Sequence, residues 1–94
     1  MRVEDVAFQW DAANTGWIWR RHRVRPRQAE QAFLDPNNLP VEASSMGPER
    51  REAVIGMADG PRLLHIVWTE HGNAVRILHA RNATAHEAEL YFRQ

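Results

Sequence analysis

The first part of the chain predicts one strand followed by two helices. Over the first ten residues the apolar side chains recur mostly at even spacing, as in a strand that buries one face. Asp11 then offers a side-chain cap for a helix over residues 12–23. A second helix is expected over residues 26–34, because a proline suits its first position and an Asp-Pro pair follows its last.

The remainder of the chain predicts three consecutive strands and a last helix. Residues 35–48 hold three prolines, two asparagines and a glycine, so we expect a loop with at most one short edge strand. Apolar and β-branched residues separated by turn sequences then predict a meander. Its strands are expected at residues 51–57, 62–70 and 75–81. Thr84 and Glu87 have the spacing of a capping box, which indicates that a helix follows.

These elements predict an α+β fold on a small antiparallel sheet, in the order β-α-α-β-β-β-α. The chain has 94 residues, a usual length for one domain, so we expect a single domain over residues 1–94. Hydrophobic residues make up 44% of the sequence, which is enough for one modest core.

Composition removes several classes of protein. Without cysteine the chain cannot form a disulfide, a thiolate zinc site or a thiol nucleophile. Its start is charged and lacks a long apolar run, so we expect no signal peptide, no membrane span and a cytoplasmic location. Twelve basic and twelve acidic side chains give a net charge of zero, which argues against a general coat protein for nucleic acids.

The positive charge is concentrated in one short segment. No acidic residue lies between Asp11 and Glu30, whereas five arginines fall within residues 20–27. They are Arg20, Arg21, Arg23, Arg25 and Arg27, which we call the basic run. Every basic residue of the chain is arginine, which suits bidentate contacts to phosphate, although genome composition alone can produce the same usage.

Short motifs follow one another in an unbroken order over residues 7–92. They are Phe8-Gln9-Trp10-Asp11, Arg21-His22, Ala29-Glu30-Gln31-Ala32-Phe33, Asp35-Pro36, Arg62-Leu63-Leu64, Thr69-Glu70, Val75-Arg76-Ile77, Ala80-Arg81 and Ala83-Thr84, with Glu87 and Tyr91 after them. In this order and spacing the sequence resembles the BrnT family of toxins.

The resemblance implies a small ribonuclease toxin of a type II toxin–antitoxin system, with a RelE-like fold and no cofactor. It implies a cognate antitoxin of the ribbon-helix-helix type that neutralises the toxin in a hetero-oligomer. It further implies that RNA is the substrate and that operator DNA is bound through the antitoxin alone.

Cleaving RNA without a metal requires a base for the 2′-hydroxyl, an acid for the leaving 5′ oxygen and cations around the phosphorane. Histidine suits either proton role near neutral pH, and arginine supplies fixed positive charge. His22 matches the histidine position of the family and is our first candidate. Alternatively, it lies near a helix C-terminus simply because positive charge is favoured there.

Arg76 and Arg81 are the further catalytic candidates. They lie five residues apart on one predicted strand, so they point to opposite faces unless a bulge reorients one of them. Arg51 and Arg62, at the entries of neighbouring strands, are expected to add charge to one rim. The alternative is that Arg76 and Arg81 are ordinary strand residues paired with acidic side chains of the sheet, Glu70 or Glu52.

Tyr91 is a further assisting candidate, because a phenol can stack on a base or bond a phosphate. The alternative is that Tyr91 docks the last helix on the sheet. Glu49 is a weaker candidate base, since a carboxylate two residues from Arg51 more often forms a surface ion pair.

The other aromatic side chains favour packing roles. His65 and His79 can face each other across a hairpin, but two imidazoles without a carboxylate are a weak metal signal, and we expect no metal site. Most of the four tryptophans are expected in the core. Of Trp17 and Trp19 at least one should be exposed, and it is a candidate antitoxin contact.

The sequence departs from the family pattern close to His22. Ile18 stands at an often polar position, Arg23 where a glycine usually ends the helix, and Arg27-Gln28 where an acidic pair usually opens the next helix. An altered substrate or a lost activity is therefore an alternative. The main competing hypothesis is a toxin-like interaction module with little catalysis that binds an antitoxin and contributes to operator regulation. A free-standing RNA-binding domain is the third.

Overall fold

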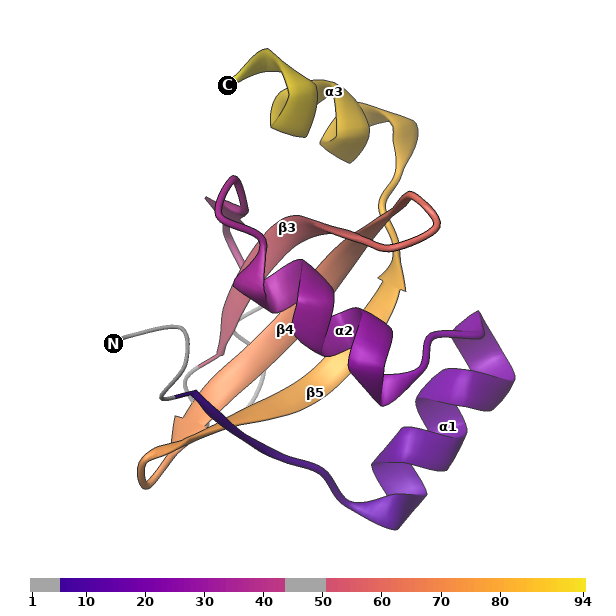
Figure 1. Cartoon of the computed structure of the whole chain (residues 1–94), viewed down its shortest axis with the longest axis vertical. Coiled ribbons are helices and arrows are strands. Elements are labelled where there is room, and N and C mark those ends of the chain that lie inside the picture. The colour runs from indigo at the N-terminus through magenta and orange to yellow at the C-terminus, as the bar shows by residue number, and fades with distance from the viewer. Residues whose placement is uncertain (1–5, 44–50) are drawn as a thin grey trace.

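The computed structural model describes residues 6–43 and 51–94 and contains the predicted order of helices and strands (Figure 1). The elements are β1 (Ala7–Gln9), α1 (Ala12–His22), α2 (Pro26–Leu34), β2 (Leu39–Val41), β3 (Glu52–Ala58), β4 (Arg62–His71), β5 (Ala74–Asn82) and α3 (Ala85–Arg93). The α+β prediction is therefore confirmed, and β2 is the short edge strand expected in the proline-rich segment. Glu49 lies outside the described residues.

The five strands form one sheet in the order β1-β5-β4-β3-β2. The pairs β2–β3, β3–β4 and β4–β5 are antiparallel, as predicted. The prediction of a wholly antiparallel sheet is wrong at one edge, because β1 pairs with β5 in parallel. Two helices separate β1 from the meander along the chain, and such a connection lets a strand return in either direction, which hydrophobic spacing alone does not specify.

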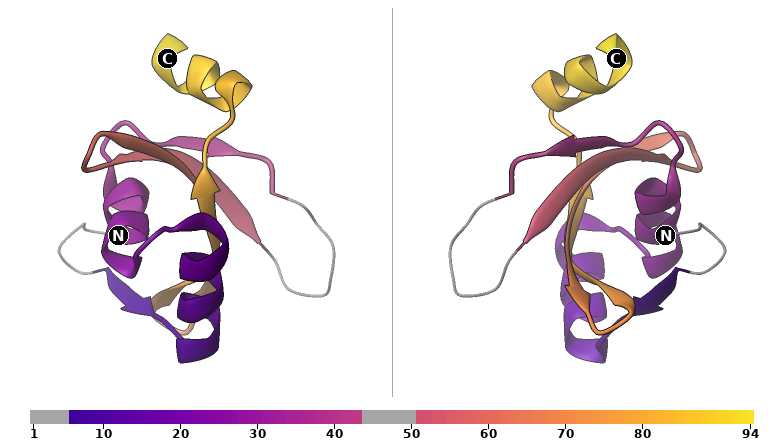
Figure 2. Two further views of the ribbon diagram at one scale, coloured as in Figure 1. Left: turned by 90° about the vertical axis from the view of Figure 1, so that its right-hand side faces the viewer. Right: turned by 90° about the vertical axis from the view of Figure 1, so that its left-hand side faces the viewer.

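Helix α2 packs against one face of the sheet (Figure 2). Its Ala29 and Ala32 are completely buried, and the backbone of α2 comes so close to β3 that a Cβ atom on Gly56 would lie 1.9 Å from the carbonyl oxygen of Ala32. Glycine is therefore required at this contact. The main hydrophobic core lies on this side of the sheet.

Helix α1 lies along the part of β5 that β1 leaves unpaired. Strand β1 reaches Arg76, and beyond it the side-chain amide of Asn14 donates to the carbonyl oxygen of Ile77 at 2.8 Å. This bond satisfies one group of the exposed strand edge. Ile18 is 1% exposed within the core, so this departure from the family pattern packs the helix and does not line a site.

Helix α3 lies beyond one end of the sheet and begins at the predicted capping box, in which Thr84 and Glu87 exchange hydrogen bonds (Figure 1). Tyr91 is 8% exposed, and its hydroxyl donates to the carboxylate of Asp35 at 2.5 Å.

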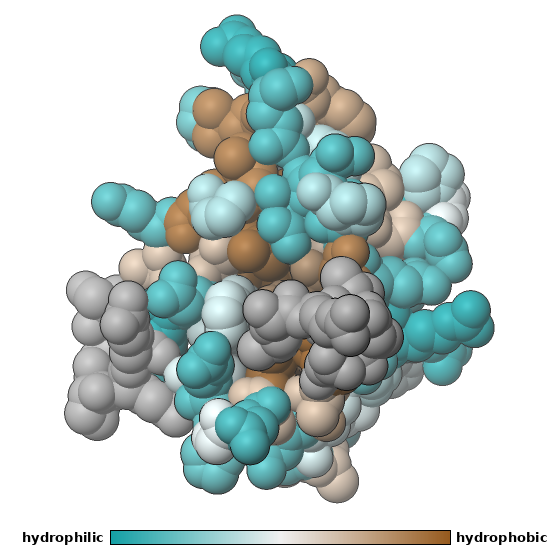
Figure 3. Space-filling view, turned by 60° about the vertical axis from the view of Figure 1, so that its left-hand side comes forward, coloured by the Kyte–Doolittle hydropathy of each residue, from teal (hydrophilic) through white to brown (hydrophobic). Residues whose placement is uncertain are grey.

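Leu90 and Phe92 are exposed on the same helix, and apolar surface is visible in the upper part of Figure 3, where α3 meets the sheet. No helix among the described residues is long and apolar enough to cross a membrane.

The turn between α1 and α2 keeps a left-handed residue although glycine is absent. Arg23 has φ 55° and ψ 39°, and its backbone N–H donates to the carbonyl oxygen of Trp19. The guanidinium of Arg62 donates to the carbonyl oxygens of His22 and Arg23, at 2.8 and 2.6 Å. These bonds hold the helix end in place against the unfavourable backbone conformation of Arg23.

We predict that Arg23→Gly raises the free energy of unfolding by about 0.5 to 1 kcal/mol, because glycine adopts this conformation without a Cβ clash. The loss of the Arg23 guanidinium, which lies 5.3 Å from the Trp19 ring centroid, keeps the gain small. Urea unfolding measures the change. Arg21→Gly, inside α1, is the matched control and should lower the same quantity by up to about 1 kcal/mol. A lower urea midpoint for Arg23→Gly would contradict the prediction.

Candidate active site

A β-bulge in β5 determines which side chains share a face of the sheet. Val67 of β4 is opposite His79, but the next residue, Trp68, is opposite Ile77. Leu78 is therefore an extra residue in β5, with no partner of its own in this register.

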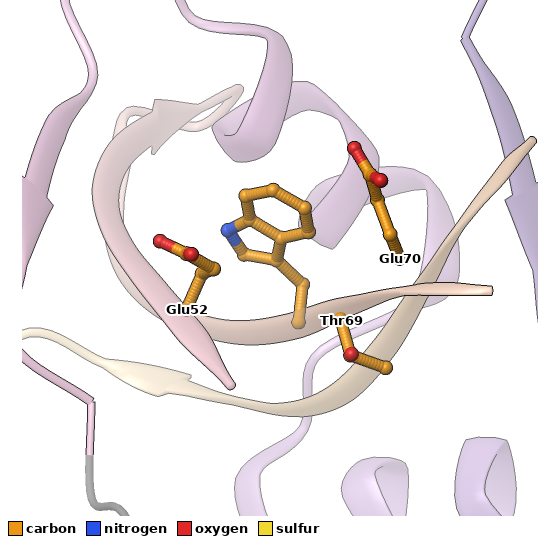
Figure 4. A pocket seen from close by; sticks show the side chains of 4 residues that line it. Glu52, Thr69 and Glu70 are labelled. Carbon is orange, nitrogen blue, oxygen red and sulfur yellow. The ribbon is translucent and has the colours of Figure 1, made fainter. Parts of the chain in front are cut away.

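The bulge places Arg76, His79 and Arg81 on one face. Their partners in β4 are Thr69, Val67 and His65, which are alternate residues of one strand and so point to the same side. Figure 4 shows this alternation, since Thr69 projects to the side opposite Glu52 and Glu70. In a regular strand Arg76 and Arg81 would point to opposite faces. The bulge, which the sequence analysis names as the exception, puts them on the same face. We call this side, opposite α2, the open face.

Two imidazoles meet at the centre of the open face. Nε2 of His22, in the last turn of α1, lies 3.1 Å from Nε2 of His79, in β5. The rings are nearly perpendicular, with centroids 4.8 Å apart. When both rings are neutral, a hydrogen bond between these nitrogens requires a proton on Nε2 of one ring and none on Nε2 of the other. The second ring then carries its proton on Nδ1, so the two rings are different tautomers.

An arginine–glutamate pair completes the cluster. The guanidinium of Arg81 donates to both carboxylate oxygens of Glu87, at 2.8 and 3.1 Å. Nε2 of His65 lies 3.7 Å from the same carboxylate, while its Nδ1 is buried without a partner in the part of the chain that the structure describes. We call these five residues, His22, His65, His79, Arg81 and Glu87, the histidine cluster.

Burial and positive charge keep the imidazoles neutral. Burial lowers the pKa of His79 to about 4, and His22, Arg81 and His65 act in the same direction. Burial is also the largest cause of the lowered pKa of His22, to which three neighbouring arginines add. For His65, burial and Arg81 lower the pKa, whereas Glu87 opposes them. The hydrogen bond from Arg81 lowers the pKa of Glu87 to about 2, so this carboxylate is ionised at neutral pH.

The predicted arginines are distributed over the open face and its borders. Arg81 lies near both imidazoles of the pair, since its charge lowers the pKa of His22 and of His79. Arg76 lies farther along β5, where it faces Asp11 with an N–O distance of 3.7 Å. At about 3.3 Å per residue, the bulge leaves it about 13 Å from Arg81 along the strand.

Arg51 and Arg62 do not share a rim. The entries of consecutive antiparallel strands lie at opposite ends of a hairpin, so that prediction is wrong. Arg51 lines a cavity of about 420 Å³ together with Trp17, Val67, Leu78 and His79, next to the cluster. Arg62 binds the end of α1 instead.

Tyr91 docks α3 against the rest of the protein and is not part of the histidine cluster. Its hydroxyl is engaged with Asp35, which also accepts hydrogen bonds from the backbone N–H groups of Asn37 and Met57. The bond to Asp35 raises the pKa of Tyr91 to about 12, so the phenol keeps its proton.

The basic run is exposed where α1 passes into α2. All five of its side chains are exposed. Two of their guanidinium groups lie over the ring of Trp19, that of Arg25 at 4.3 Å and that of Arg23 at 5.3 Å from the ring centroid. Gln28, the second departure at the start of α2, accepts a hydrogen bond from the backbone N–H of Arg25 and so caps the helix. The turn is thus compatible with the loss of the acidic pair.

His65, His79 and Glu87 are the members of the histidine cluster that the sequence analysis does not single out for catalysis. In the sequence, His65 and His79 suggest only a weak metal signal. The available signal for His79 was its position two residues before Arg81, which puts both on one face of a strand. Glu87 belongs to the motifs of the resemblance and to the predicted helix cap, but its contact with Arg81 depends on the docking of α3.

No group of three or more side chains suited to hold a metal ion is found within residues 6–43 and 51–94. A separate cavity of about 330 Å³ is lined by Glu52, Trp68, Thr69 and Glu70 (Figure 4). These lining residues provide no guanidinium or imidazole for a phosphate. Of these two cavities, only the one beside the histidine cluster is lined by a guanidinium and an imidazole, those of Arg51 and His79.

Comparisons with known proteins agree with this fold. The family model described as "Ribonuclease toxin, BrnT, of type II toxin-antitoxin system" matches residues 10–87. The crystal structure of the Brucella abortus ribonuclease toxin BrnT is similar with a TM-score of 0.65 and 15% sequence identity, over 84% of this chain and 97% of that one. At this identity the similarity establishes the fold alone. A search of curated protein sequences gives no significant match.

We predict that the folded protein loses stability as the pH falls below about 6.5. An unfolded histidine binds a proton near that pH, whereas folded His79 does so only near pH 4, so protons favour the unfolded chain between these values. Between pH 7.5 and pH 5, urea unfolding should show a decrease that includes about 1 to 2 kcal/mol from His79, and His79→Gln should remove that part. The lowered pKa values of His22 and His65 account for part of the decrease that remains. His86→Gln is the matched control, because His86 is exposed on α3. Equal pH dependence in wild type and His79→Gln would contradict this account.

Proposed function

Because this chain belongs to the BrnT family of ribonuclease toxins of type II toxin–antitoxin systems, we propose that it is an endoribonuclease that cleaves RNA without a metal at the histidine cluster. The observation that carries the proposal is the imidazole pair, His22 and His79, 3.1 Å apart and beside Arg81 on the open face. Two proton-transfer groups and a fixed cation are the parts that this chemistry needs.

In the proposed reaction the imidazole pair moves both protons. A neutral imidazole accepts the proton of the 2′-hydroxyl while the 2′ oxygen bonds to phosphorus. The bond from phosphorus to the 5′ oxygen breaks, and a protonated imidazole donates a proton to that leaving oxygen. A bound phosphodiester brings a negative charge next to the pair, which favours the protonated form that the free protein disfavours.

Arg81 is proposed to stabilise the charge on the non-bridging oxygens. A guanidinium has five N–H donors, so its two bonds to Glu87 leave capacity for phosphate. Glu87 is then a positioning residue, because it fixes the planar guanidinium on the open face. Tyr91 assists by anchoring α3, the helix that carries Glu87.

The remaining arginines are proposed to bind other parts of the RNA strand. Arg51 lies at the cavity beside His79, and Arg76 at the far end of the same face. The exposed basic run adjoins His22 at the end of α1, where it is suited to follow successive phosphates. Salt should therefore weaken substrate binding.

The proposed partner is a cognate antitoxin of the ribbon-helix-helix type, in a hetero-oligomer in the cytoplasm. Type II systems neutralise the toxin with a protein, and the family assignment supports such a partner. The net charge of zero does not favour direct binding of the toxin to a duplex, so operator DNA is expected to be bound through the antitoxin. A short reading frame next to this one, encoding such a protein, would support the assignment.

We predict that His22→Ala, His79→Ala and Arg81→Ala each lower the rate of RNA cleavage at least about 100-fold and abolish growth arrest on induction. Purified toxin is assayed on single-stranded and structured RNA in the presence of EDTA, which should leave the wild-type rate unchanged. His86→Ala, on the exposed side of α3, is the control and should cleave normally. Thermal melts must show that each variant is folded. Wild-type protein that neither cleaves RNA nor arrests growth would favour the interaction module instead.

A further inference from the structure

The cavity beside the histidine cluster has the composition of a base-binding site. Its lining residues are Trp17, Arg51, Val67, Leu78 and His79, around about 420 Å³. A flat aromatic ring, two aliphatic side chains and one guanidinium suit a nucleobase, which needs apolar contact on its faces and hydrogen bonds at its edge.

Trp17 is exposed and yet held in a defined position. Its side chain is 44% exposed, one of the few large hydrophobic side chains at the surface of the described residues. Its ring centroid lies 5.9 Å from that of His22 and 5.6 Å from that of His79. A ring fixed by two neighbours loses little conformational freedom when a base stacks on it.

The bulge supplies part of the wall of the cavity. Leu78, the extra residue of β5, has no cross-strand partner and lines the cavity with Val67 of β4. The same irregularity that brings Arg76 and Arg81 to one face therefore also contributes an aliphatic surface beside the imidazoles.

We propose that this cavity binds the base of a nucleotide directly adjacent to the scissile phosphate, with Trp17 stacking on the base and Arg51 contacting its edge. The inference rests on the proposed function and adds to it a site that selects the nucleotide. The position follows from His79, which belongs both to the imidazole pair and to the cavity wall. A base and its own phosphate are joined through one ribose. The cavity and the imidazole pair, which share His79, are therefore suited to the base and the phosphate of one nucleotide.

The test uses the full chain and compares 3′-mononucleotides of the four bases with inorganic phosphate, by isothermal titration calorimetry. We expect at least one nucleotide to bind wild-type protein about tenfold more tightly than phosphate. Trp17→Ala should reduce that nucleotide affinity at least about fivefold and leave phosphate affinity unchanged, and Trp17→Phe should restore most of it. Phe92→Ala, an exposed aromatic residue on α3, is the matched control and should bind as wild type does.

A second variant covers the case in which Trp17→Ala does not fold. Leu78→Trp fills the cavity from the side of the sheet, and should weaken the nucleotide without weakening phosphate. Equal nucleotide affinity in wild type and in a folded Trp17 or Leu78 variant would overturn the proposal. The proposal would also be overturned if either variant lost the same affinity for phosphate as for the nucleotide. Loss of antitoxin binding by Trp17→Ala with unchanged nucleotide affinity would show that the cavity takes a protein side chain, and would also overturn it.

Cleavage assays separate this inference from the proposed function. If wild-type protein cleaves RNA and Trp17→Ala cleaves at the same rate and the same sites, the base site is wrong while the ribonuclease stands. If wild-type protein does not cleave RNA but binds nucleotides through Trp17, the base site stands and the proposed reaction is wrong.

Discussion

The geometry of the site depends on one extra residue in β5. In a strand of regular alternation with His79 and Arg81 on the open face, Arg76 would point into the core and Ile77 out of it. The bulge at Leu78 reverses this, so that Ile77 is 1% exposed while Arg76 reaches Asp11. Burial of an unpaired guanidinium costs several kcal/mol, which makes the regular alternative unfavourable. The bulge therefore serves the core and the open face together.

Burial and nearby positive charge act in the same direction on the pKa of His79 but in opposite directions on the pKa of Glu87. Burial and the nearby guanidinium groups keep the imidazoles neutral, whereas the same Arg81 keeps Glu87 ionised. The cluster thus holds a fixed ion pair beside groups that have not yet taken up a proton. Such a site is suited to an anionic substrate, because the phosphate supplies the negative charge that the free imidazoles lack.

Most of the fold could be predicted from local pattern, but much of the site could not. The capping box at Thr84 and Glu87 and the proline at the start of α2 are short-range signals, and the structure confirms the helices that they predict. The parallel pairing of β1 and the bulge at Leu78 arise from contacts between distant segments, so spacing within one strand did not reveal them. For the same reason the sequence identifies His22 and Arg81 individually, but it does not predict that His79 contacts His22 or that Glu87 binds Arg81. The RelE-like fold that the resemblance implies stays a prediction.

The attachment of α3 has a consequence for how the protein is made. Residues 85–93 follow all five strands in the chain, and yet they contact earlier segments. Glu87 binds Arg81 of β5, and Tyr91 donates a hydrogen bond to Asp35, which precedes β2. During synthesis the strands and the imidazoles emerge from the ribosome before the helix that orients the guanidinium. A nascent polypeptide that ends short of α3 therefore contains His22, His65 and His79 but lacks Glu87, the residue that fixes the guanidinium of Arg81. The order of translation itself delays completion of the site until the sheet has been made.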